Sequence, residues 1–188
     1  MQTIIISGSR NSQGQTARAI EAIRSGIAAN GSQVETVFLP PLRIERCRQC
    51  EDNGWGLCRK EGRCVIEDDF AGVADKIRGA KCVVFATPVY YSDLSESLRA
   101  FLDRLRRTCT HKDGKAGIEN KPVAGVCVAG GGGGGAPACC ASLERILATC
   151  GFVVVDMVSV RRQNLNAKLP VLELTGGWLA QQSSLPTP

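Results

Sequence analysis

The segment 7–16 holds the densest group of side chains that could bind an anion. Four hydroxyls, three amides and one arginine fall within these ten residues, between the apolar run Ile4–Ile6 and an amphipathic stretch. Such a pattern is typical of a strand, a loop and a helix, and the helix N-terminus adds about half a positive charge. The alternative is an ordinary turn between a strand and a helix. We favour a phosphate site with Arg10 nearby, and its predicted donors are Ser9, Ser12, Gln15 and Thr16.

The same loop argues against two common nucleotide sites. It does not end in the Gly-Lys-Ser/Thr of a P-loop, which disfavours a triphosphate, and no G-x-G-x-x-G follows the first strand, which disfavours a dinucleotide. A single phosphate held by hydroxyls, amides and the helix dipole therefore fits this loop best.

Two further loops could hold a flat ring beside that phosphate. The sequence Pro88-Val89-Tyr90-Tyr91 offers a rigid edge and two aromatic faces, and Gly130–Gly135 leaves bare backbone that a ring can approach closely. The tyrosines could instead pack in the core or cap a helix, and the glycines could be a plain connection. A phosphate at one loop and a ring at the other two describe a mononucleotide such as FMN. The predicted ring contacts are Pro88, Val89, Tyr90, Tyr91, Gly130, Gly131 and Gly132.

The cysteines form a second group with chemical potential. The chain has ten of them and opens on a strand without a basic leader, so we expect a cytoplasmic protein in which metal or redox use of thiols outweighs disulfides. Four share one polar loop: Cys47, Cys50, Cys58 and Cys64. Five follow apolar patterns and are expected in the core: Cys82, Cys127, Cys139, Cys140 and Cys150. Cys109 fits neither group, and the single histidine, His111, is expected on the surface.

The overall composition indicates one globular domain. The chain has 188 residues, of which 44% are hydrophobic, and no apolar run approaches the roughly 20 residues of a membrane helix. The net charge is +5, but only 5% of the residues are aromatic and they do not alternate with basic ones. Nucleic acid is therefore disfavoured, and small anionic partners suit this charge better.

Apolar periodicity divides the chain into five strands alternating with four helices. We predict strands at 1–7, 34–39, 81–87, 122–129 and 152–160, and helices at 16–29, 70–79, 94–105 and 137–150. Because the strands are apolar through their middles, they indicate a parallel sheet with helices on both faces, whose ligand sites lie at the strand C-termini.

Several segments lie outside this alternation. Residues 42–67 form a cysteine-rich insertion after the second strand. Asp68-Asp69 is predicted to cap the next helix, and Asp93 with Glu96 resembles a capping box. Residues 161–188 are expected to be a C-terminal extension with one short helix near Trp178, followed by a Ser/Pro-rich end.

Three loops together resemble a known family. Segment 7–16 resembles the G-S-x-R-x-x-G-N-T phosphate loop of the NADPH-dependent FMN reductase and iron-sulfur flavoprotein families, with Asn11 where the family Arg usually stands and Gln15 in place of Asn. Thr87–Tyr91 and Leu98–Arg104 are similar to their P-V-Y loop and to a helix ending in F-I-D-R, and the glycine run sits where they place a flavin-flanking loop. On this resemblance Asn11 joins the predicted phosphate contacts.

The resemblance covers residues 1–160. It implies a flavodoxin-like, doubly wound, five-stranded parallel sheet in the order 2-1-3-4-5, with bound FMN and NAD(P)H or another donor of electrons. It also implies homodimers or homotetramers whose FMN sites lie at subunit interfaces. The domain boundary expected from it separates an FMN-binding domain at 1–160 from the extension at 161–188.

The cysteine loop departs in part from the iron-sulfur flavoprotein pattern. That pattern looks like C-x2-C-x2-C-x4–7-C before an Asp-Asp helix start, whereas seven residues separate Cys50 from Cys58 here. Four thiolates within eighteen residues can still hold a 4Fe-4S cluster, and the neighbouring basic residues would offset its negative charge. A zinc ion, a thiol pair or no metal at all remain alternatives.

These observations favour an FMN-dependent oxidoreductase. It would pass electrons from NAD(P)H or a redox protein to a small acceptor such as a quinone or free flavin, with the 4Fe-4S cluster relaying single electrons if present. No catalytic side chain is predicted, because the flavin carries the chemistry. The alternatives are a non-enzymatic electron carrier that docks to a ferredoxin-like protein, and a zinc-stabilised interaction module.

Overall fold

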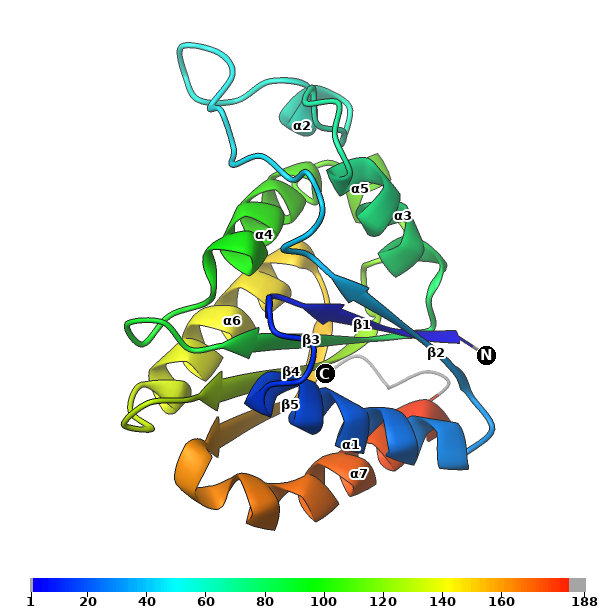
Figure 1. Ribbon diagram of the computed structural model, residues 1–188. Helices are drawn as coiled ribbons and strands as arrows, with labels where there is room; N and C mark the ends of the chain where they lie inside the picture. Colours follow the sequence, from blue (N-terminus) through cyan, green and yellow to red (C-terminus); the bar gives the residue numbers. More distant parts are fainter. Residues whose placement is uncertain (1, 183–188) are drawn as a thin grey trace.

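The computed structural model describes residues 2–182 and contains one five-stranded parallel sheet (Figure 1). The strand order β2-β1-β3-β4-β5 confirms the predicted flavodoxin-like topology. The strands are β1 Gln2–Ser7, β2 Gln33–Phe38, β3 Cys82–Pro88, β4 Pro122–Ala129 and β5 Val153–Arg161. Their bounds agree with the predicted segments to within one residue. The central strands β1, β3 and β4 are marked by continuous apolar runs because they are buried on both faces, whereas the edge strand β2 mixes polar and apolar residues.

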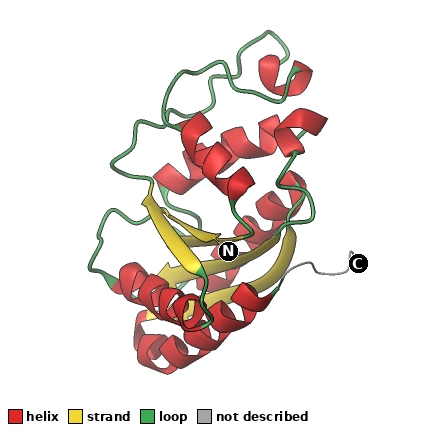
Figure 2. Cartoon of the chain, turned by 90° about the vertical axis from the view of Figure 1, so that its right-hand side faces the viewer, coloured by secondary structure: helices red, strands yellow, loops and turns green. Residues whose placement is uncertain are grey.

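Helices cover both faces of this sheet (Figures 1 and 2). One face carries α1 Gln15–Ala29 and α7 Leu165–Gln181, and the other carries α3 Phe70–Gly79, α4 Glu96–Thr108 and α6 Ala136–Cys150. Two short helices, α2 Leu57–Lys60 and α5 Lys112–Lys115, and the 3-10 turn Arg162–Asn164 complete the elements. Among the described residues, no helix is both long and apolar enough to cross a bilayer.

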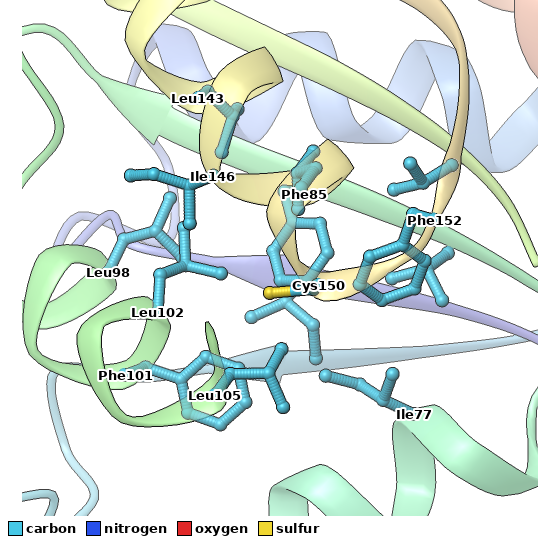
Figure 3. Close-up of a cluster of buried hydrophobic side chains, with 14 of the residues drawn as sticks. Ile77, Phe85, Leu98, Phe101, Leu102, Leu105, Leu143, Ile146, Cys150 and Phe152 are labelled. Carbon is cyan, nitrogen blue, oxygen red and sulfur yellow. The ribbon is translucent and has the colours of Figure 1, made fainter. Parts of the chain in front are cut away.

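Alternate residues of the central strands feed two separate cores. Ile5 and Val84 pack towards α1 and α7, whereas Ile6 and Phe85 pack towards α3, α4 and α6. In the second core, the rings of Phe85 and Phe152 meet edge to face with centroids 6.0 Å apart (Figure 3). This two-sided burial holds the strand C-termini rigidly at one edge of the sheet, where the loops diverge.

The C-terminal segment differs from the expected short helix. Helix α7 has 17 residues and lies directly along α1, although it contains Pro170 and two glycines. A Cβ atom at Gly26 would lie 1.9 Å from the carbonyl oxygen of Glu173, and one at Gly176 would lie 2.2 Å from that of Ile23. The backbones therefore touch through glycines, and this tertiary contact outweighs the poor local helix propensity of the segment. The Ser/Pro-rich end at 183–188 lies outside the described residues.

The predicted capping box at Asp93 is wrong. Helix α4 starts one residue after Ser95, and the Asp93 carboxylate instead accepts the N–H of Leu94 and pairs with Arg99. Asp68 accepts the N–H of Phe70 at 3.1 Å, as expected for the start of α3, although Asp69 makes no side-chain cap. In both cases another group engages the carboxylate: Asp93 pairs with Arg99, six residues further along the chain, and Asp69 accepts the main-chain N–H of Arg43 at 2.7 Å.

Candidate functional site

A pocket of about 490 Å³ lies at the C-terminal edge of the sheet, where three loops meet. It joins the phosphate loop after β1 to the Pro88–Tyr90 segment after β3 and to the glycine run after β4. Its lining residues are Ser9, Asn11, Gly14, Gln15, Thr16, Pro88, Val89, Tyr90, Val128, Gly130 and Gly131. The topology thus brings together the three segments that the sequence singles out, as expected for a doubly wound sheet.

The phosphate loop is folded by its own polar groups. The Ser9 hydroxyl accepts the N–H of Asn11 at 3.3 Å and donates to the carbonyl of the same residue at 3.1 Å. The Asn11 side-chain oxygen accepts the N–H of Gln13 at 2.9 Å. These bonds turn the chain so that the first turn of α1 faces the pocket.

The start of α1 fits an anion. Its N-cap residue Gly14 has no side chain, the first turn contains no acidic residue, and no side chain caps the helix. The Gln15 side-chain oxygen is buried and has no hydrogen-bond partner among the described residues. Open N–H groups and the positive end of the helix dipole are what a bound phosphate would satisfy, whereas the unpaired Gln15 oxygen is an acceptor and needs a donor.

Helix α4 fits closely against this loop. The Ser97 hydroxyl donates to the carbonyl of Gly8 at 3.2 Å, and a Cβ atom at Gly8 would lie 2.3 Å from the Ser95 hydroxyl oxygen. Only glycine permits this approach.

The aromatic loop places its two tyrosines differently. Tyr90 and Asp93 exchange main-chain hydrogen bonds of 3.0 and 2.9 Å, and the intervening Tyr91 and Ser92 adopt left-handed φ angles of 50° and 65°. Tyr91 is fully exposed and lies outside the pocket lining, whereas Tyr90 is 42% exposed and lines the pocket. The tight turn explains the difference, because a reversal at 91–92 directs successive side chains to opposite sides.

The four loop cysteines line a second, smaller pocket. Cys47, Cys50, Cys58 and Cys64 share it with several neighbours, three of them basic: Arg48, Arg104 and Arg107. Its free volume is about 20 Å³, room for one water molecule. Within residues 2–182 no group of three or more Cys, His, Asp or Glu side chains has the spacing of metal ligands. The donor set fits a thiolate-bound metal chemically, and the sulfurs would have to draw closer to ligate one.

Helix α4 anchors the cysteine segment from below. Arg104 and Asp68, both almost fully buried, form an ion pair of 2.6 Å between α4 and the start of α3. Arg107 donates to the carbonyl of Gly54 at 2.7 Å and stacks on the ring of Trp55, with 4.7 Å between the guanidinium carbon and the ring centroid. Basic side chains of one helix therefore hold the insertion.

Residues 1–165 match the family described as NADPH-dependent FMN reductase. The chain belongs to the NADPH-dependent FMN reductase family. The resemblance seen in the three loops is thereby confirmed.

Several relatives of this reductase-family chain are iron-sulfur flavoproteins. MJ1083 of Methanocaldococcus jannaschii is 30% identical over 56% of this chain, and a protein of Archaeoglobus fulgidus is 28% identical over the same share. The matched part spans about half of these two relatives, 52% and 46% of their lengths. The iron-sulfur flavoprotein of Methanosarcina thermophila is 29% identical over 80% of this chain and 74% of its own.

Solved structures show the same fold. RosB, solved with bound 8-demethyl-8-formylriboflavin-5'-phosphate, is 17% identical, with a TM-score of 0.72 over 96% of this chain and 79% of RosB. The NAD(P)H:quinone oxidoreductase of Methanothermobacter marburgensis is 18% identical, with a TM-score of 0.71 over 95% of this chain and 96% of its own.

The predicted flavin contacts of this reductase-family chain fall into two groups in the structure. Nine of the thirteen line the pocket, and the other four are exposed outside its lining: Arg10, Ser12, Tyr91 and Gly132. Two residues line the pocket that were not predicted to do so. Gly14 directly precedes the predicted contact Gln15, and Val128 lies in β4 just before the glycine run. That any of them binds FMN stays a prediction.

The remaining cysteines lie in the core. Cys82, Cys127, Cys139, Cys140 and Cys150 are buried as predicted, and Cys109 joins them with 1% exposure. A hydrogen bond with Cys150 lowers the pKa of Cys109 despite burial, and burial raises the pKa of Cys82. His111 lies 24% exposed at the start of α5, where its Nδ1 atom accepts the N–H of Asp113 at 3.2 Å.

Proposed function

We propose that this chain is an FMN-dependent oxidoreductase that takes electrons from NAD(P)H and passes them to a small acceptor such as a quinone or free flavin. The observation that carries the proposal is the single pocket in which the phosphate loop, Pro88–Tyr90 and Gly130–Gly131 meet. FMN, when bound, supplies a ring that accepts a hydride and releases electrons singly or in pairs.

The residues of the pocket would bind and orient the cofactor. Ser9, Gln15 and Thr16 would donate to the phosphate at the start of α1, where the dipole favours negative charge. The Ser9 hydroxyl would turn its proton from the carbonyl of Asn11 to the phosphate. Pro88 and Val89 would provide a rigid edge against the ring. A Cβ atom at Gly130 or Gly131 would meet nothing within 4 Å, so the glycine loop leaves open space on its side of the pocket.

We further propose that the four loop cysteines hold a 4Fe-4S cluster. The support is their shared pocket, the three arginines that line it, and the iron-sulfur flavoprotein names of several relatives. Four thiolates concentrate negative charge, which neighbouring guanidinium groups offset. The cluster would exchange single electrons with a ferredoxin-like protein. Zinc is the alternative occupant of the same thiols.

Anaerobic purification followed by absorbance spectroscopy and elemental analysis tests both proposals. The expected protein is yellow-brown, with flavin bands, iron and acid-labile sulfide. A steady-state assay with NADPH and a quinone then separates an enzyme from a carrier, since bound FMN without turnover would identify the carrier. A colourless protein that does not take up added FMN would refute the flavin proposal, and zinc in place of iron would refute the cluster.

The assembly is proposed to be a homodimer or a homotetramer. Exposed apolar side chains support this: Tyr90 in the lining of the pocket at the sheet edge, Tyr91 next to it on the turn, and Val171, Leu174 and Trp178 along α7. Sedimentation equilibrium of the purified protein measures the oligomeric state directly.

A further inference from the structure

Arg104 is a deeply buried charged residue in the lining of the cysteine pocket. It is 2% exposed, and its two terminal nitrogens are fully engaged. One donates to the carbonyl of Glu45 at 3.1 Å and to Asp68 at 2.6 Å. The other donates to the carbonyl of Ile66 at 3.3 Å and to Asp68 at 2.9 Å. Glu45 and Ile66 bracket the four cysteines, so one guanidinium holds both ends of the cysteine segment.

The fifth donor of the same group is unused. The Nε–H of Arg104 is buried and has no acceptor among the described residues. Buried donors in native proteins are nearly always satisfied, by the protein or by a ligand. Because the guanidinium is planar and its terminal nitrogens are fixed, the direction of this N–H is fixed as well.

The unused donor belongs to a side chain that lines the cysteine pocket. Burial opposes the charge on Arg104, but hydrogen bonding to Asp68 and the proximity of Cys64 outweigh it and raise the pKa of the guanidinium. Cys64 is the last of the four loop cysteines and stands beside Val65 and Ile66 in the same pocket lining. The cation is thus held charged, next to sulfur.

We propose that Arg104 is a positioning residue of the cysteine pocket, whose Nε–H donates to a metal-bound sulfur while its terminal nitrogens hold the two ends of the cysteine segment together. This inference rests on the proposed function, in which the four thiols bind a metal. Groups that hydrogen-bond to metal ligands orient them and tune the metal centre. Since Asp68 neutralises the charge of Arg104, the donor acts through a directed hydrogen bond. Glu45 pairs with Arg48 at 2.7 Å, so the excess positive charge in the pocket lining comes from Arg107.

Lysine cannot replace this arginine. Its ammonium group carries the same charge, but it cannot reach Glu45, Ile66 and Asp68 at once while aiming another donor at sulfur. The variant Arg104→Lys therefore separates charge from geometry. The double variant Asp68→Asn/Arg104→Gln keeps a neutral, hydrogen-bonding pair and avoids leaving one buried charge alone. Arg106→Gln is the matched control, because Arg106 lies on the same helix, is exposed and pairs with Asp103 at 2.9 Å.

The experiment uses Co²⁺ as a probe of the full-length protein under anaerobic conditions, with the thiolate-to-cobalt absorbance as the readout. We expect Co²⁺ to bind about 10–100-fold more weakly to Arg104→Lys and to the double variant than to the wild type. Bound FMN and the circular dichroism spectrum should be unchanged, and Arg106→Gln should match the wild type. In protein reconstituted with ferrous iron and sulfide, Arg104→Lys should also lower the midpoint potential, because the lost donor stabilises the more negative, reduced state.

The outcomes distinguish this inference from the proposed function. Wild-type Co²⁺ affinity and potential in both Arg104 variants would overturn the role of Arg104 and leave the metal centre standing. A wild-type protein that binds FMN but neither Co²⁺ nor iron would overturn the metal centre, and the role of Arg104 with it, and leave the flavin site standing.

Discussion

The Ser97 hydroxyl donates to the main-chain oxygen of Gly8 across 3.2 Å, and this bond ties helix α4 to the phosphate loop. Seven residues further along the same helix, Arg104 holds the cysteine segment through Asp68. A helix rises about 1.5 Å per residue, so roughly 10 Å of α4 separate the two contacts. One rigid helix therefore supports both the flavin pocket and the cysteine pocket.

The close contact at Gly8 predicts that a larger side chain at this position lowers the free energy of unfolding. In Gly8→Ala, the new methyl group would lie 2.3 Å from the Ser95 hydroxyl and 2.9 Å from the Leu98 Cβ atom. Such overpacking costs about 1–3 kcal/mol of unfolding free energy, measurable by urea denaturation. Gly134→Ala is the control, since a Cβ atom there meets nothing within 4 Å. Equal stability of the two variants would contradict this packing.

Substitutions of the phosphate-loop residues that line the pocket are predicted to weaken FMN binding. Ser9→Ala and Thr16→Ala should each weaken FMN binding by about 10–100-fold, because a hydrogen bond to a charged group contributes about 1.5–3 kcal/mol. Quenching of free flavin fluorescence on titration gives the dissociation constant. Ser12→Ala should bind FMN normally, since Ser12 lies outside the pocket lining. If Ser12→Ala lost FMN as strongly as Ser9→Ala, the pocket geometry would be wrong.

The separation of the two pockets predicts that a cysteine substitution removes the metal without removing FMN. Cys58→Ser should abolish iron binding while FMN stays bound, because the two pockets share no lining residue. Iron analysis and flavin absorbance of the same sample measure both. Cys140→Ala, in the core, should keep its iron. Loss of iron in both variants would point to a general effect on folding.

The buried ion pair predicts a large cost and a defined pH dependence. Asp68→Asn leaves Arg104 charged and unpaired, which costs about 3–5 kcal/mol of unfolding free energy. Removing one carboxylate from the exposed pair Glu21–Arg24, in Glu21→Gln, should cost at most about 1 kcal/mol. Chemical denaturation at neutral pH compares the two variants.

The pH dependence follows from the pKa of Asp68. Burial raises this pKa, but the hydrogen bonds from Arg104 and from the N–H groups of Glu45 and Phe70 outweigh burial and lower it. A carboxyl group with a lowered pKa stabilises the fold above its unfolded pKa of about 3.9, and that contribution is lost as the pH falls through the folded value. The wild type should therefore lose more stability than Asp68→Asn on acidification below about pH 4.

Lys121 predicts a second rise of stability with pH, in alkali. Its Nζ atom donates to the carbonyl oxygens of Ile77 and Arg78 at the end of α3, and burial lowers its pKa from 10.5 to about 8. The folded state therefore releases this proton earlier than the unfolded state, so stability should rise between about pH 8 and 10.5. Lys121→Met removes the group and should flatten this rise, as measured by denaturation at both pH values. An unchanged slope would contradict the lowered pKa.

Local sequence determined most of the sheet and the flavin pocket. The three central strands are apolar on both faces, so continuous runs mark them. The phosphate loop, the Pro88 loop and the glycine run each follow one of these strands directly. Parallel topology then brings these loops to one edge without further information. For this reason most of the predicted contacts lie in one pocket.

Tertiary structure decided the features that depend on partners far apart in the chain. Asp68 was expected only to cap a helix, yet it binds Arg104, thirty-six residues away. Helix α7 forms although it contains a proline and two glycines, because Gly26 of α1 and Gly176 of α7 allow the backbones of the two helices to touch. A local pattern records the propensity of a segment and the face it buries. The local pattern does not show which distant charged residue or glycine the segment will contact, since those contacts form only when the sheet has brought the helices together.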